Sequence, residues 1–253
     1  MSGHNKWSTI KHKKAAADAK RGKVFTRLAK EITAAARAGG GDADMNPRLR
    51  SAITAGKNAN MPNDNIDRAV KKGTGELGGD MLEELVYEGF APGGIAILID
   101  CLSDNRNRTA AEIRNIFTKT NNNMASNGAV ARLFNRKARF AIEGEHADEE
   151  ELMMLLLEAD VDVEAIEVDD EQAEIIAPPE AFDAILKVLE DNEISPSESG
   201  VVRMPETTLP VTDVKTAQQI MSLMETIEEN DDVQEVVSNA DFSDEVLASL
   251  EDE

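Results

Sequence analysis

Lysine and arginine are the residues of this sequence whose types and spacing most clearly suggest a chemical role. The chain opens with GHNKWSTIKHKK at Gly3–Lys14, which has four lysines, one tryptophan and no acid. Lysines hold phosphate by charge, and an aromatic ring between them can stack on a nucleobase. The residues of this basic arm that we predict to bind nucleic acid are Lys6, Trp7, Lys11, Lys13 and Lys14. For Trp7 the alternative is packing of the arm onto the first helix.

A basic stripe continues from the arm. Residues 14–38 contain no proline and much alanine, which predicts a helix. Its apolar residues recur at 3.6-residue spacing and share one face: Val24, Phe25, Leu28 and Ile32. Amphipathic helices usually mix charges on the outer face, but here that face is almost purely positive. We expect it to bind phosphate through Lys20, Lys23, Arg27, Lys30 and Arg37. Neutralising about five phosphates would give a slope of log K against log salt of about −4 to −5.

Two shorter helices extend the basic field. Asn46 and Pro47 are typical of a helix N-cap and first position, and that helix should run to about Asn58. A third helix should run from Asn63 to about Lys72. The cations that these helices add are Arg48, Arg50, Lys57, Arg68, Lys71 and Lys72.

A second cluster, SDNRNRTAAEIR, begins at Ser103. It places Arg106 and Arg108 at the start of a predicted helix, where backbone N–H groups and guanidinium groups suit a phosphate. The alternative is that Asp104 or Glu112 pairs with these arginines. The following TNNN loop, Thr120–Asn123, can supply left-handed turn positions.

The charges of the chain divide it sharply. Residues 1–72 hold 16 Lys+Arg and 6 Asp+Glu, residues 73–140 hold 8 of each, and residues 141–253 hold 3 and 35, within a formal net charge of −22. The basic part suits a polyanion, and the acidic part would be repelled by one. This asymmetry predicts that the molecule binds a nucleic acid with its basic part toward it and its acidic part away from it.

No pattern points to an enzyme or a metal centre. The three histidines, His4, His12 and His146, have no metal-ligand spacing with the single cysteine, Cys101. GTGELGG at Gly73–Gly79 lacks the Gly-Lys-Ser/Thr of a P-loop and is better explained as a linker. We expect no cofactor, no catalysis and no membrane span, and a soluble protein of the cytoplasm.

Hydrophobic patterning predicts an α+β chain with a helical N-terminal domain and two domains that combine helices and sheets. Residues 79–136 should give strands at 82–88, 95–102 and 129–134 and a helix at 104–119. Residues 137–205 follow the order βαββαβ, which is ferredoxin-like. A helix at 213–229 and a strand at 233–237 then complete the middle domain, so the third domain is inserted in it. The predicted domains are residues 1–78, residues 79–136 with 206–240, and residues 137–205, followed by an acidic tail at 241–253.

The motifs resemble one family. GHNKWSTIKHKK, NPRLRSAITAGKNANMPNDNIDRAVKKG, YEGFAPGGIAILID and DNRNRT are similar to the YebC/PmpR family, densely over about residues 2–136. The chain departs from the pattern at Ser103, where many members have threonine, and at Asn121–Asn123, where many have a Gly-Gly turn. The resemblance implies three domains, the third inserted in the second, without catalysis. It also implies nucleic-acid binding and control of gene expression, through transcription or through translation at stalled ribosomes.

Two function classes follow from these observations. The first is a nucleic-acid-binding regulator, whose partner is duplex DNA, ribosomal or transfer RNA, or the ribosome. The sequence shows no helix-turn-helix signature, and a flexible basic arm with one aromatic fits RNA at least as well as DNA. The second is a protein-interaction adaptor, with a protein partner on the acidic domain and no contact to nucleic acid.

Overall fold

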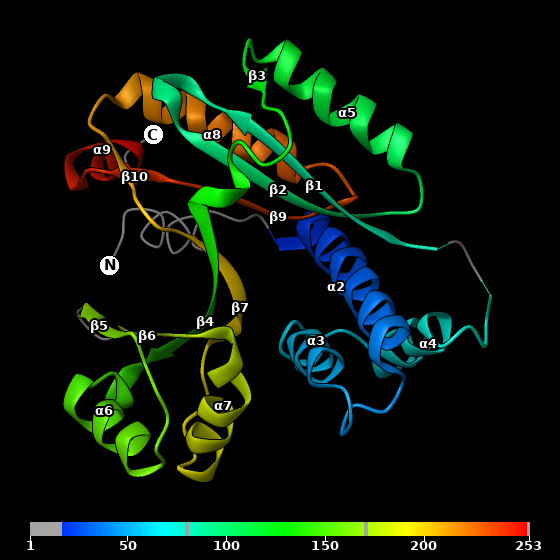
Figure 1. The fold of residues 1–253 in the computed structure, drawn as a ribbon, viewed down its shortest axis with the longest axis vertical. Helices are drawn as coiled ribbons and strands as arrows, with labels where there is room; N and C mark the ends of the chain where they lie inside the picture. The colour runs from blue at the N-terminus through cyan, green and yellow to red at the C-terminus, as the bar shows by residue number, and fades with distance from the viewer. Residues whose placement is uncertain (1–16, 79–80, 170–171, 252–253) are drawn as a thin grey trace. The chain divides into compact units, whose positions relative to one another are not determined.

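The computed structural model describes residues 17–78, 81–169 and 172–251, without the side chains of residues 17–21, 244 and 251 (Figure 1). The described chain divides into two compact units. The smaller unit is residues 133–206, and the larger unit combines the chain before it with the chain after it. The α+β class is confirmed, with N-terminal helices followed by sheet-containing parts.

Three helices begin the larger unit: α2 (Ala17–Gly39), α3 (Pro47–Asn58) and α4 (Asn63–Gly73). The predicted N-cap is confirmed, since the Asn46 side chain accepts a hydrogen bond from the Leu49 N–H and Pro47 is the first helical residue. Ile32, Leu49 and Ile66 supply one core residue from each helix. Helices α2 and α4 approach closely at Gly73, where an added Cβ would lie 2.5 Å from the Thr33 carbonyl oxygen.

A four-stranded sheet of order β3-β1-β2-β9 forms the rest of this unit, and all its pairs are antiparallel. Its elements are β1 (Glu83–Phe90), a 3-10 turn (Pro92–Gly94), β2 (Ala96–Ser103), α5 (Arg106–Lys119), β3 (Asn123–Met124), α8 (Val214–Glu228) and β9 (Val233–Ser238). Apolar residues of α5 and α8 pack with one face of β1 and β2 in a single core (Figure 1). Since β2 and β9 are neighbours, the sheet joins segments that lie on either side of the smaller unit in the sequence.

The C-terminal residues differ from the acidic tail that we expected. After α8 and β9, β10 (Ala240–Phe242) pairs in parallel with β8 (Leu209–Val211), and α9 (Asp244–Glu251) follows. Val246, Leu247 and Leu250 of α9 belong to the core of the larger unit. Although the segment is acidic in composition, its apolar residues at i, i+1 and i+4 pack it as a helix.

The smaller unit has a sheet of order β5-β6-β4-β7, again antiparallel throughout. Its elements are a 3-10 turn (Ala131–Leu133) leading into β4 (Phe134–Glu143), a second such turn (Gly144–His146), α6 (Glu149–Glu158), β5 (Ala165–Asp169), β6 (Gln172–Ala177), a third turn (Pro179–Ala181), α7 (Phe182–Asp191) and β7 (Glu198–Pro205). The order along the chain is βαββαβ. In its core Phe140 stacks on Phe182, with ring centroids 4.9 Å apart. The separate strand expected at 129–134 does not form, because the chain turns there before β4 begins.

A buried carboxylate explains how the chain turns before β4. Glu88 of β1 is only 3 % exposed, and its two oxygens accept hydrogen bonds from the backbone N–H groups of Gly128, Val130 and Ala131 at 2.5–2.9 Å. An ionised carboxylate strengthens each of these hydrogen bonds and satisfies backbone donors that the sheet does not use. Glu88 therefore holds the segment that leads out of the larger unit.

Replacing Glu88 by glutamine should lower the free energy of unfolding by about 1–3 kcal/mol, since the amide nitrogen cannot accept and the charge is lost. Urea unfolding followed by circular dichroism measures this change. Glu83→Gln, at an exposed position of the same strand, is the control and should change stability by less than about 1 kcal/mol. Equal destabilisation by both variants would contradict the role assigned to Glu88.

Candidate nucleic-acid interface

Cations of the predicted basic stripe of α2 contact other parts of the chain in the structure, although Lys23 stays exposed. Lys23 donates to the carbonyl oxygen of Glu229 at 3.1 Å, and Arg27 donates to that of Glu228. Both carbonyls lie at the C-terminal end of α8, where backbone oxygens lack helical partners and the helix dipole is negative. Three members of the stripe, Lys23, Arg27 and Lys30, therefore contact their own chain, and binding of phosphate by the stripe stays a prediction.

Lys30 enters a buried network centred on Asp232. The Asp232 carboxylate is 4 % exposed and accepts hydrogen bonds from Lys30 at 2.7 Å and from Arg108 at 2.7 Å. Ser103 and Thr109 donate their hydroxyls to the same carboxylate at 3.0 and 2.7 Å. One side chain from the α8–β9 turn thus joins α2, β2 and α5.

The ionisation of Asp232 follows from this environment. Burial by itself would raise the pKa of Asp232, but hydrogen bonds from Arg108, Lys30 and Thr109, with the positive charge of Lys30, outweigh it. The pKa of Asp232 is held well below its ordinary value. The carboxylate therefore stays charged, as a buried acid must when it balances two cations.

Other predicted cations of α2 and α3 also contact their own chain or are partly buried. Arg48 contacts Glu31 at 2.7 Å and Glu84 at 2.6 Å, and the hydrogen bond to Glu31 is the main reason that the pKa of Arg48 is raised. Arg50 donates to backbone carbonyls of the α2–α3 turn. Arg37 is partly buried, and its Nη1 atom has no hydrogen-bond partner among the described residues.

Other predicted residues fall outside what the structure describes. The Lys20 side chain is among them, although its backbone lies in α2. The whole basic arm is also outside the described residues, namely Lys6, Trp7, Lys11, Lys13 and Lys14. Their role in binding stays a prediction.

Four predicted cations are exposed on α3 and α4. Arg68, Lys71 and Lys72 stand at i, i+3 and i+4 of α4, on the side away from its buried residues Ile66 and Ala69. Lys57 occupies the last turn of α3 and is exposed as well. Within the described residues, the side chains of Lys57, Arg68, Lys71 and Lys72 form no salt bridge. Their charges are therefore available to a partner.

The arginine cluster at the start of α5 is divided between two roles. Asn105 caps the helix by accepting from the Arg108 N–H at 3.1 Å. The Arg108 side chain binds Asp104 at 2.9 Å as well as Asp232, so the ion-pair alternative is confirmed for Asp104. Glu112 instead accepts from Asn230. Arg106 is exposed, and no side-chain contact is described for it.

Sequence reasoning missed two further exposed cations, Arg114 and Lys119 of α5. A search for cations on the helix beyond its first turn would have found them.

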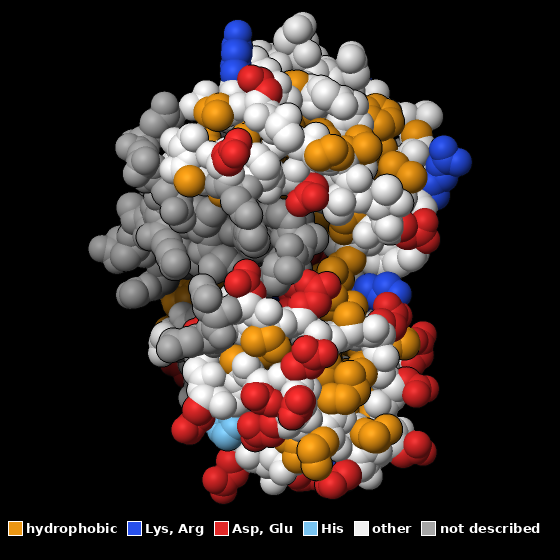
Figure 2. Space-filling view, turned by 90° about the vertical axis from the view of Figure 1, so that its left-hand side faces the viewer, with side chains coloured by type: hydrophobic (Ala, Val, Ile, Leu, Met, Phe, Trp, Pro, Cys, Tyr) orange, Lys and Arg blue, Asp and Glu red, His pale blue; other side chains and the backbone are white. Residues whose placement is uncertain are grey.

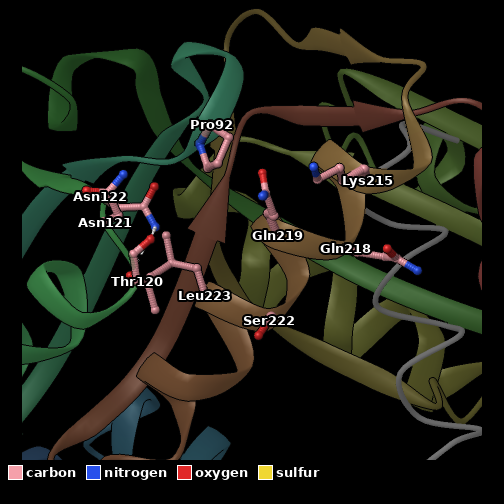
Figure 3. Close-up of a pocket in the computed structure, with 9 residues that line it drawn as sticks. All are labelled: Pro92, Thr120, Asn121, Asn122, Lys215, Gln218, Gln219, Ser222 and Leu223. Carbon is pink, nitrogen blue, oxygen red and sulfur yellow. Dashed lines mark hydrogen bonds between the residues drawn. The ribbon is translucent and has the colours of Figure 1, made fainter.

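The left-handed position in the TNNN loop is confirmed at Asn121, with φ of 55°. This loop and α8 line a pocket of about 550 Å³, with Thr120 and Asn122 on one wall and Gln219 and Ser222 on the other (Figure 3).

In the part of the chain that the structure describes, no group of three or more histidine, cysteine or acidic side chains is placed to hold a metal ion. No helix in the same residues is both long and apolar enough to cross a membrane.

The fold and the charge distribution define a mixed α+β protein with a basic helical N-terminal part followed by sheet-containing domains. Two family models match this chain. The model described as the TACO1/YebC protein N-terminal domain matches residues 5–76, and the model described as the TACO1/YebC second and third domain matches residues 82–240. The chain belongs to the TACO1/YebC family, as its motifs predicted.

Similar proteins extend over nearly the whole chain. A probable transcriptional regulatory protein of Geobacter sulfurreducens is 50 % identical over 250 residues, covering 99 % of this chain and 100 % of its own. One of the same name from Syntrophus aciditrophicus is 49 % identical over 251 residues, covering 99 % of each chain. The crystal structure of a conserved hypothetical protein from Aquifex aeolicus is 42 % identical, with a TM-score of 0.84, and covers 94 % of this chain and 97 % of its own. The family's curated relatives thus carry the name of regulators.

Proposed function

We propose that this protein is a non-enzymatic, nucleic-acid-binding regulator of gene expression that binds the phosphate backbone through its basic N-terminal domain. The observation that carries the proposal is a group of four exposed cations on α3 and α4 that form no salt bridge with any described residue, namely Lys57, Arg68, Lys71 and Lys72. Phosphate is the chemical group that such a field attracts. The name shared by the relatives, probable transcriptional regulatory protein, supports a regulatory role.

Two other features support this surface. The arm at residues 3–14 adds four lysines and a tryptophan at the same end of the chain. Arg106, Arg114 and Lys119 of α5 add exposed cations in the same compact unit. Residues 141–253, with 3 basic and 35 acidic side chains, would be repelled by a polyanion and so direct the basic part toward it.

The proposal leaves the kind of nucleic acid to experiment, because phosphate contacts position a protein without reading sequence. One route is regulation of transcription on duplex DNA, and the other is translation control on ribosomal or transfer RNA. Base stacking by Trp7 would favour unpaired RNA, whose bases are accessible.

A salt titration of the full-length protein tests the proposal. Affinity for a fluorescent RNA hairpin and for a DNA duplex of equal length is measured from 50 to 300 mM KCl. If the four exposed cations each neutralise one phosphate, log K should fall with log salt at a slope of about −3 to −4. An affinity that does not change with salt would contradict phosphate binding.

Co-sedimentation with purified ribosomes, with excess random duplex DNA as competitor, then separates the two routes. Retention on ribosomes would favour RNA and translation. Loss to the competitor would favour duplex DNA, and a search for specific promoters would follow.

A further inference from the structure

Helix α6 of the smaller unit has an apolar face that the described residues of this unit leave exposed. Residues 152–157 read LMMLLL, six consecutive apolar side chains, so this stretch of the helix is apolar around its whole circumference. A helix of that kind is normally buried all round. Only one side of α6 is buried, with Leu152 at 0 % and Leu156 at 1 % exposed, packed in the core against β5 and α7.

The opposite side of α6 faces outward. Met153, Met154 and Leu157 are 38 %, 61 % and 74 % exposed. Their positions at i, i+1 and i+4 place them together on about a third of the helix circumference. Single exposed apolar residues need no explanation, but three neighbours on one outward face form a patch. Methionine suits such a patch because its flexible thioether adapts to different partners.

Acidic residues surround this patch. Glu150 lies on the same outward face, and Glu151 and Glu158 flank it; all three are exposed. Figure 2 shows the lower part of the molecule, which contains α6 and α7, with apolar side chains set among acidic ones. Residues 133–206 contain 22 acidic and 5 basic residues. The potential around the patch is therefore strongly negative.

We propose that the outward face of α6 is a docking surface for a basic protein segment, one that presents apolar side chains between lysines or arginines. Charge complementarity selects this occupant, because a nucleic acid, an anionic membrane or a second acidic unit would be repelled. The apolar contact of Met153, Met154 and Leu157 supplies affinity, and the acids supply orientation and exclude wrong partners. The surface is separate from the exposed cations of α3 and α4, so the two proposals can fail independently.

The first experiment measures binding of three fluorescent peptides to the full-length protein by anisotropy. The peptides are an amphipathic helix of leucine and lysine, the same helix with serine for leucine, and the same helix with glutamate for lysine. The first should bind at least tenfold more tightly than either of the others. Equal binding of the serine peptide would overturn the proposal, because attraction would then be electrostatic only.

Variants locate the contact. Met154→Gln with Leu157→Gln keeps the charge of α6 and should weaken binding of the leucine–lysine peptide at least tenfold. Leu209→Gln, at an exposed leucine of β8 in the other unit, is the matched control and should leave binding unchanged. Unchanged binding by the α6 variant would overturn the proposal. Both substitutions are at exposed positions, so circular dichroism should show intact folding.

Two further results distinguish this proposal from its alternatives. Sedimentation velocity measures whether the protein forms dimers. If it does, and if Leu157→Gln abolishes them, the face serves self-association and the proposal of a basic partner is wrong. A variant lacking the exposed cations Lys57, Arg68, Lys71 and Lys72 should bind the peptide as the wild type does. If that variant lost the peptide, the docking surface would not be on α6.

Discussion

Replacing Asp232 by asparagine should lower the free energy of unfolding by about 3 kcal/mol at pH 7. The carboxylate accepts charged hydrogen bonds from Lys30 and Arg108, and each such bond contributes about 1.5–3 kcal/mol. Part of the lost stabilisation is kept, because Lys30 also donates to backbone carbonyls and Arg108 also binds Asp104. For a chain of this size the loss corresponds to a fall in Tm of about 6–12 °C, measurable by calorimetry.

The control for this prediction is Asp231→Asn. Asp231 is the exposed neighbour and accepts from Lys30 through its backbone oxygen, which the substitution keeps. It should change stability by less than about 0.5 kcal/mol. Equal loss in both variants would show that net charge, and not the network around Asp232, is responsible.

The same network predicts how stability depends on pH. Because the folded-state pKa of Asp232 lies below the unfolded value of about 3.9, the unfolded chain binds the proton more readily. The stabilisation is complete above about pH 5 and is lost as the pH falls toward the folded-state pKa. The difference between wild type and Asp232→Asn should therefore shrink from pH 5 to pH 2 in urea unfolding. A difference that grew on acidification would refute the assignment.

Removing the exposed cations should produce the largest effect on binding. Glutamine at Lys57, Arg68, Lys71 and Lys72 together should weaken affinity for nucleic acid by about 10²–10³-fold at 0.1 M salt. The slope of log K against log salt should become shallower by about 3–4. None of these side chains makes a salt bridge within the described residues, so the fold should be unaffected.

A pairwise comparison controls for net charge. Lys71→Gln with Lys72→Gln removes two charges from α4, and Lys187→Gln with Lys215→Gln removes two exposed lysines elsewhere. The first pair should reduce the salt slope by about 2, and the second should leave it unchanged. Equal effects would mean that binding follows overall charge and that α4 is not the contact. Lys23 and Arg27 are unsuitable for this test, because they hold α8.

Local patterns predicted the elements of this protein well. The Asn46–Pro47 start of α3, the buried run of β2 and the helix that ends at Lys119 all follow from neighbouring residues, and the structure confirms them. The acidic tail and the strand at 129–134 were wrong. In both cases a contact distant in sequence decides the local structure. Helix α9 packs into the core, and Glu88 holds the turn before β4.

The sequence by itself determined the fold class, the family and the division of charge along the chain. These depend on composition, periodicity and motif, which are properties of neighbouring residues. Only the tertiary structure decided which cations contact partners within the chain. Lys23, Arg27 and Lys30 meet partners about 200 positions away, and the Arg108 partner Asp232 is 124 away. Helix periodicity places side chains on a face, but the element that covers the face is chosen by packing of the whole chain.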